Sequence, residues 1–174
     1  NLALLYQTQG DYVKAEPLHK HSLDILEEVL GPNHPNVAVG LNNLGALYEN
    51  QGDYIKAEPL YTRSLDIREK TLGSDHPDVA TALNNLAGLH RAQGDYTSAR
   101  SLYVRSVDIL EKALGPNHPN VANGLNNLAD LYRAQGYYAM AKPFYERSLE
   151  IWEKALGPDH PNMATGLNNL GALY

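Results

Sequence analysis

The sequence contains no cysteine, which excludes disulfide bridges, thiolate nucleophiles and cysteine-based zinc sites. A cysteine-free chain fits the reducing cytosol, so we expect a cytoplasmic location. Aromatic residues are few in kind, because one Phe and one Trp stand beside 12 Tyr. This excess of one aromatic type indicates that a single element carrying tyrosine has been copied.

Long apolar runs and basic clusters are also missing. No apolar stretch approaches the length of about 18 residues that a membrane span needs, and no charged-then-apolar leader is present. The 14 Lys and Arg residues are scattered among 20 acidic ones, for a net charge of -6, and no basic run could neutralise a series of phosphates. We therefore expect neither a membrane nor a nucleic acid as partner.

The main feature of the sequence is an internal repeat. The stretch LGPNHPNVA at Leu30–Ala38 returns three times, identical or slightly altered, each time 42 residues further on. Four such periods account for 168 of the 174 residues, and the last six, NLGALY, have the phase of the opening NLALLY. A period of this size is typical of arrays in which no repeat buries its apolar face alone. Because the chain starts within a repeated element, we expect that Asn1 is not the native start.

We expect a single repeat array over residues 1–174. The repeats are 1–34, which lacks the start of its first helix, then 35–76, 77–118 and 119–160, and finally 161–174, which holds one helix only.

Each complete repeat reads as two helices. Within 35–51 the apolar residues follow a 3.6-residue spacing, which predicts a helix, named helix A. Gly52 accepts a positive φ and ends helix A, and Asp53 can cap the next helix. Residues 54–72 form helix B, whose apolar positions cover about 160° of the helical wheel. So broad a face predicts that helix B packs on two helices, its own helix A and the next.

The proline-bracketed histidine belongs to the connector between repeats. Gly31 stops helix B, Pro32 blocks its continuation, and Pro35 suits the first turn of the next helix A. His34 is then a residue at a helix start. A zinc site would need several ligands around one ion, whereas stacked repeats separate equivalent positions by about two helix diameters of ~10 Å each. We expect no metal at the equivalent residues His34, His76, His118 and His160.

The segment LGALYENQGDYIKAEPLYTRSL resembles the tetratricopeptide repeat, in the 42-residue form of the kinesin light chain. The resemblance covers the whole chain, although the usual proline after helix B is missing and eight extra residues extend helix B and its connector. It implies an all-α fold, a right-handed superhelical α-solenoid of stacked antiparallel helix pairs, whose concave face is lined by A helices and binds peptides. The signature positions are Leu44, Gly45, Tyr48, Gly52, Tyr54, Ala57, Tyr61 and Ser64.

Transferred to this sequence, the resemblance places an asparagine of each helix A in the groove, where a carboxamide can pair with an extended peptide backbone. The alternative is that these asparagines only solvate the helix or bond neighbouring repeats, a role we expect for the following Asn43, Asn85, Asn127 and Asn169. The implied groove residues are Asn42, Asn84, Asn126 and Asn168, then Val39, Thr81, Asn123 and Thr165, then Ala46, Gly88, Asp130 and Ala172, and Glu49, Arg91 and Arg133.

The charge of these positions favours one class of ligand. In the family, grooves that bind carboxylates or acidic cargo use Lys and Arg on the A helices. Here Arg91 and Arg133 stand against Glu49 and Asp130, so we expect a neutral or weakly polar extended protein segment. No nucleophile is paired with an oriented base at a unique place, and the serines fall on packing positions or in turns. We therefore predict a binding module that is not an enzyme and needs no cofactor.

Two departures from the repeat raise separate expectations. Tyr137 replaces a helix-capping Asp, a loss that typically costs ~1 kcal/mol. Trp152 stands where other repeats have Leu or Arg; it fills space beside the last helix A or, in the alternative, docks a partner.

The last helix A has no helix B after it in this sequence, and terminal repeats usually carry polar caps. The alternative function is therefore a structural scaffold or spacer that self-associates head-to-tail. The residues expected to form the uncovered stripe are Leu167, Leu170, Leu173 and Tyr174.

Overall fold

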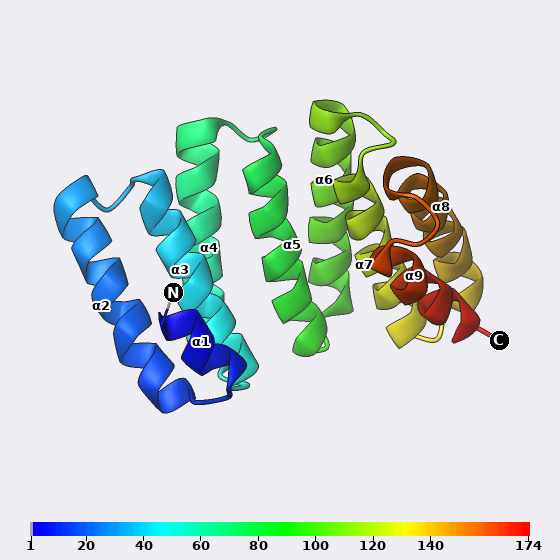
Figure 1. Cartoon of the computed structure of the whole chain (residues 1–174). Coiled ribbons are helices and arrows are strands. Elements are labelled where there is room, and N and C mark those ends of the chain that lie inside the picture. Colours follow the sequence, from blue (N-terminus) through cyan, green and yellow to red (C-terminus); the bar gives the residue numbers. More distant parts are fainter. Residues whose placement is uncertain (1) are drawn as a thin grey trace. The chain divides into compact units, whose positions relative to one another are not determined.

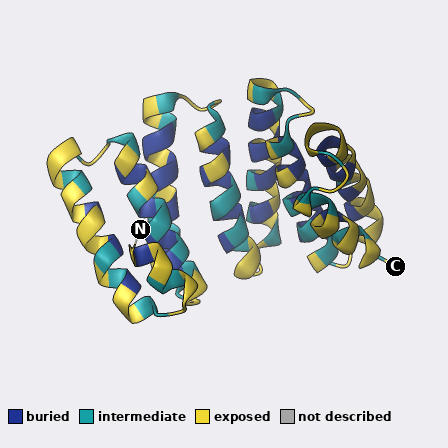
Figure 2. Cartoon of the chain, in the orientation of Figure 1, coloured by how far each residue is buried: buried dark blue, intermediate teal, exposed yellow. Residues whose placement is uncertain are grey.

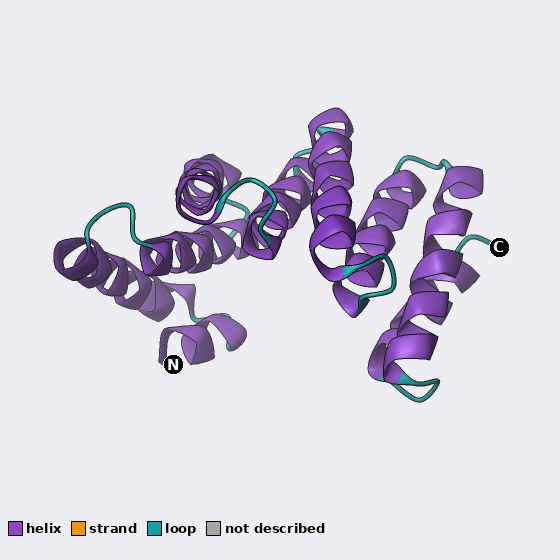
Figure 3. Cartoon of the chain, turned by 90° about the horizontal axis from the view of Figure 1, so that it is seen from above, coloured by secondary structure: helices purple, strands orange, loops and turns teal. Residues whose placement is uncertain are grey.

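The computed structural model describes residues 2–174, and Asn1 lies outside the described residues. These residues form nine α-helices joined by short loops, with no strand among them (Figures 1 and 3). The fold is therefore an all-α helical repeat, as the periodicity predicts. The helices are α1 (Leu2–Thr8), α2 (Tyr12–Leu30), α3 (Pro35–Asn50), α4 (Tyr54–Leu72), α5 (Pro77–Ala92), α6 (Tyr96–Leu114), α7 (Pro119–Ala134), α8 (Tyr138–Leu156) and α9 (Pro161–Gly171).

The helices belong to two compact units, which are described separately. The first unit, Asn1–Ser74, holds α1 to α4, and the second unit, Asp75–Tyr174, holds α5 to α9. Within each unit every helix packs against the next one along the chain. Odd-numbered helices are the A helices and even-numbered helices are the B helices. Each B helix has 19 residues, and three of the four continue through an internal proline.

The turn between an A helix and its B helix depends on two residues. Gly52 has a φ of 75°, a conformation that glycine adopts without a steric penalty. The Asp53 carboxylate then accepts a hydrogen bond of 3.2 Å from the Lys56 N–H, one of the free donors at the start of α4. Tyr137 occupies the corresponding place before α8 and forms no side-chain cap, as its sequence predicts.

Each repeated histidine caps the start of a full-length A helix or of α9, which confirms the structural role expected from the sequence. Before α7, the His118 Nδ1 accepts a hydrogen bond of 3.1 Å from the Asn120 N–H, and Pro119 occupies the first helical turn. The same bond precedes α3, α5 and α9. The histidine therefore satisfies a backbone donor that the helix itself cannot pair.

We predict that His118→Ala lowers the free energy of unfolding by about 1 kcal/mol, because the Asn120 N–H loses its acceptor. His118→Asn should be close to neutral, since asparagine supplies an acceptor of similar reach at a helix N-cap. Urea denaturation followed by circular dichroism measures both. Equal losses in the two variants would show that the ring contributes packing rather than a cap.

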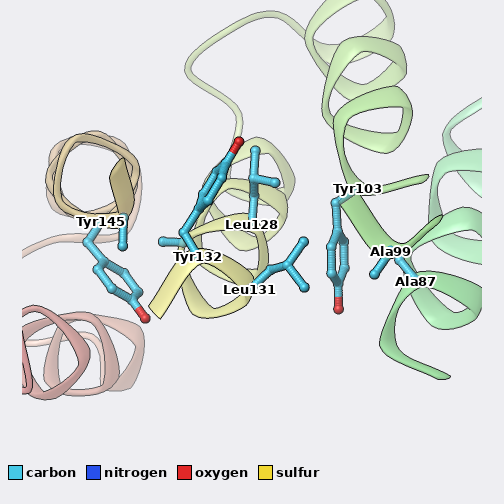
Figure 4. Close-up of a cluster of buried hydrophobic side chains, with 9 residues drawn as sticks. Ala87, Ala99, Tyr103, Leu128, Leu131, Tyr132 and Tyr145 are labelled. Carbon is cyan, nitrogen blue, oxygen red and sulfur yellow. The ribbon is translucent and has the colours of Figure 1, made fainter. Parts of the chain in front are cut away.

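The core of the second unit lies between its A and B helices (Figure 2). Figure 4 shows Leu131 between the rings of Tyr103 and Tyr132, and the Leu131 side chain is fully buried. Small residues let the helices approach closely. Ser106 is one of them, and its buried hydroxyl donates a bond of 2.8 Å to the Ala80 carbonyl, so the close approach leaves no unpaired polar group there.

Candidate functional site

The A-helix face of the second unit, formed by α5, α7 and α9, carries most of the groove residues expected from the sequence. Asn84 on α5 is half-buried, Asn126 on α7 is buried, and Asn168 on α9 is exposed. The residues one turn earlier on the three helices, Thr81, Asn123 and Thr165, are all exposed.

Asparagine side chains link neighbouring A helices across this face. Asn127 on α7 donates its amide to the Asn84 Oδ1 at 2.8 Å, and Asn169 on α9 donates to the Asn126 Oδ1 at 3.1 Å. The second asparagine of each pair therefore bonds the preceding repeat, which confirms the structural role expected for Asn127 and Asn169. The first asparagine is bonded as well, so it does not face the groove as a complete carboxamide.

The bond from Asn127 uses the side-chain acceptor of Asn84 but not its donors. Its oxygen is occupied by Asn127, and its own amide donors remain available on the half-buried side of the face. Both polar atoms of the Asn126 side chain are bonded within the protein, because its oxygen accepts from Asn169 and its amide donates a bond of 3.3 Å to the Asp130 carboxylate. Asn126 is also only 8% exposed. The face therefore offers hydrogen-bond donors to a ligand from Asn84, while Asn126 has mainly a structural role.

Two adjacent pockets lie on this face. The first, of about 210 Å³, lies between α5, α6 and α7, and the second, of about 200 Å³, lies between α7, α8 and α9. Asn123 and Asn127 line both, so the pockets meet along α7. Asn84 lines the first pocket together with Asn120, which lies about one turn before Asn123 on α7. A ligand in the first pocket would therefore lie beside Asn84.

The charged residues of this face largely neutralise one another. Asp130 accepts a bond of 2.5 Å from the Tyr145 hydroxyl and pairs with the Arg133 guanidinium at 3.3 Å. Burial, followed by the hydrogen bond to Asp130, raises the pKa of Tyr145 to about 12, so this hydroxyl stays a donor at neutral pH. Arg91 is exposed and forms no ion pair among the described residues. The face therefore carries a small surplus of positive charge and no carboxylate clamp of paired cations.

The remaining groove positions of the second unit contribute little chemistry. Gly88 on α5 is half-buried and offers no side chain, and Ala172, which follows α9, is exposed.

Within residues 2–174 no cluster of three His, Asp or Glu side chains could hold a metal ion.

The first unit carries the other groove positions. Glu49 accepts a bond of 2.6 Å from the Tyr61 hydroxyl, and burial together with this bond raises the pKa of Tyr61. Val39 is exposed, Ala46 is half-buried, and Asn42 is half-buried and has a bonding partner of its own. Glu49 therefore anchors the helix pair rather than standing free for a ligand.

One inter-helix bond recurs with different chemistry and was missed by the sequence reasoning. It joins an A-helix residue to the B-helix residue 12 positions later, as Glu49 joins Tyr61 and Arg133 joins Tyr145. In the first repeat the same register pairs Gln7 with His19 at 3.2 Å, and burial lowers the pKa of His19. The 42-residue spacing of Tyr61, Tyr103 and Tyr145 indicates that they have equivalent environments, but it does not show which A-helix residue each hydroxyl bonds.

Trp152 packs inside the second unit. It is 3% exposed, it lies against Gly166 of α9, and its Nε1 donates a bond of 3.2 Å to the Asn123 Oδ1. The space-filling interpretation of this residue is therefore confirmed. Its bond also holds the carboxamide of Asn123 at the border between the two pockets.

The apolar stripe that was expected on one helix over 161–174 is only partly uncovered, and its last two residues, Leu173 and Tyr174, follow the end of α9 at Gly171. Leu167 and Tyr174 are 56% and 88% exposed. Leu170 and Leu173, which the sequence placed on the same stripe, instead pack against the core that contains Tyr132 and Tyr145.

Comparison with known proteins gives the family. The family model described as tetratricopeptide repeat matches residues 1–70, 37–112, 78–147 and 121–174. The chain belongs to the tetratricopeptide repeat family. Such repeats typically serve as protein–protein interaction modules, and none of the described helices is long and apolar enough to cross a membrane.

Solved structures extend this likeness to the kinesin light chain form of the repeat. BtubC (BKLC) from P. vanneervenii is 29% identical, with a TM-score of 0.86, over 99% of this chain and 69% of that protein. Two structures of a Podosopora anserina putative kinesin light chain with nearly identical TPR-like repeats are 28% identical, with TM-scores of 0.83 and 0.82. Each aligns over 99% of this chain and 82% of the other. No curated protein matches the chain significantly.

Proposed function

We propose that the A-helix face of the second unit binds an extended protein segment through hydrogen-bond acceptors of that segment. The observation that carries the proposal is the bond from Asn127 to Asn84, which occupies the Asn84 oxygen and leaves its amide donors for a ligand. Backbone carbonyls of an extended peptide are acceptors of this kind, and they recur in every sequence.

The surroundings of Asn84 support the same ligand. The two pockets that meet at Asn123 and Asn127 can receive alternate side chains of an extended segment. Exposed Arg91 favours a neutral or weakly anionic segment over a basic one. The network of Asp130, Arg133 and Tyr145 holds its own charges in place, so it does not compete for a ligand carboxylate.

The test compares two substitutions of Asn84. Peptides enriched on the protein from a displayed random library would be measured by fluorescence polarisation. Asn84→Asp keeps the acceptor for Asn127 but removes the donors, so we expect about tenfold weaker binding with little change in thermal stability. Asn84→Ala should weaken binding similarly and also lose the bond to Asn127.

The proposal fails if Asn84→Asp binds these peptides as tightly as the parent protein does. A matched control is Asn168→Asp, at an exposed position on α9, which adds the same charge to the A-helix face away from the first pocket. Equal loss in both variants would assign the effect to charge rather than to the donors of Asn84.

A second candidate function is a scaffold that self-associates head-to-tail, and the exposure of Leu167 and Tyr174 favours it. The equivalent leucine of α7, Leu125, is 1% exposed, and α7 packs against the B helix α8. A second copy of the chain would cover Leu167 with its first helix pair.

We predict that the mass of the 174-residue chain measured by light scattering rises with concentration, and that Leu167→Lys keeps it monomeric. Leu167 is the suitable position because Leu170 and Leu173 pack against the core, so a lysine at either of them would also destabilise the fold. A constant monomer mass for the parent chain would rule this candidate out.

A further inference from the structure

A depression of about 280 Å³ lies on the B-helix face of the second unit, between α6, α7 and α8. Its floor consists of Leu125, Leu128 and Tyr132 on α7, all of them buried. Its walls are Val104 and Val107 on α6 and Phe144 on α8. None of these residues lines the A-helix pockets, so the depression is a separate surface.

The three wall residues are all exceptions to the repeat. Val107 is shorter than the leucine at its equivalent positions, Val104 replaces polar or charged residues, and Phe144 replaces leucine and stacks on Tyr132 with ring centroids 5.6 Å apart. Three departures on two B helices thus meet in one place, where Val107 leaves more space than a leucine would and Val104 supplies an apolar wall in place of a polar one. The equivalents are Leu23, Leu65 and Leu149 for Val107; Lys20, Thr62 and Glu146 for Val104; and Leu18, Leu60 and Leu102 for Phe144.

The rim of the depression is acidic. Glu111 is paired with the Arg147 guanidinium at 2.6 Å, which balances its charge. Asp108, one turn from Val104 on α6, is exposed and forms no ion pair among the described residues. A cationic group beside the depression would therefore meet an uncompensated carboxylate.

We propose that this depression docks a segment of a partner protein that inserts one large aliphatic or aromatic side chain and places a Lys or Arg beside Asp108. The volume lies below the range of about 300–1,000 Å³ typical of small-molecule pockets, whereas a single anchoring side chain suits it. The acidic rim disfavours an anionic membrane surface and favours a basic flank on the partner. The proposal is independent of the A-helix face.

The test uses a residue that the chain already accepts at this position. Leucine occupies the equivalents Leu23 and Leu149, each packed against a glycine of the next A helix, as Val107 packs against Gly124. Val107→Leu should therefore fold normally while it fills the depression. A displayed random peptide library would be enriched on the parent protein after depletion on Val107→Leu.

We expect enriched peptides to carry Leu, Met, Phe or Trp near a Lys or Arg. They should bind Val107→Leu about tenfold more weakly, lose affinity on Asp108→Asn, and bind Asn84→Asp as they bind the parent. Failure to enrich any peptide that discriminates against Val107→Leu would overturn the proposal. So would peptides that depend on Asn84 instead, an outcome that would leave the proposed function of the A-helix face intact.

Discussion

Replacing Leu131 with alanine is expected to lower the free energy of unfolding of the second unit by about 2–5 kcal/mol, the usual cost of truncating a buried leucine. Leu131 is fully buried in the core of α5 to α8, between Tyr103 and Tyr132 (Figure 4). Removing its branched end leaves a cavity that rigid neighbouring rings cannot close. Urea denaturation followed by circular dichroism measures this loss of unfolding free energy.

The chain supplies a matched control for this prediction. Leu173 occupies the equivalent position one repeat later, but it is only half-buried against the same core. Leu173→Ala should cost markedly less than Leu131→Ala, because part of the leucine is already in water. Equal costs would mean that the core relaxes around Leu131 or that Leu173, which follows α9, is buried more fully than its exposure indicates.

Replacing Tyr145 with phenylalanine is expected to lower the free energy of unfolding by about 1.5 kcal/mol. This is the lower end of the range for a hydrogen bond to a charged group, because the partners are partly exposed. The Tyr145 hydroxyl donates to Asp130 at 2.5 Å and accepts from the Arg133 Nε at 3.2 Å. Phenylalanine keeps the ring in the core but removes both bonds. Tyr132→Phe is the control, because no hydrogen bond of the Tyr132 hydroxyl is found within residues 2–174.

The same hydroxyl predicts how stability changes in alkali. The pKa of Tyr145 is raised from 10.0 to about 12, so its stabilising contribution is complete below pH 10 and is lost as the pH rises towards 12. The difference in stability between the parent protein and Tyr145→Phe should therefore shrink over this interval. A difference that stays constant across it would show that the hydroxyl does not titrate with these partners.

Local features of this protein could be predicted from the sequence alone. The 42-residue period, the helix pairs, the glycine turns, the place of His118 at a helix start and the missing cap at Tyr137 all follow from the repeat itself or from residues within one or two turns of each other. Their physical basis is short-range, because backbone conformation and helix capping involve neighbours along the chain.

The tertiary structure decided the chemistry of both surfaces. The bond between Asn127 and Asn84 joins residues 43 positions apart, and the meeting of Val107 with Phe144 joins two B helices. Periodicity places such residues on a face, but it does not show which atoms meet or which donors remain free. Those outcomes depend on packing between helices, where a half-buried Leu173 and a fully buried Leu131 differ although their repeats are nearly the same.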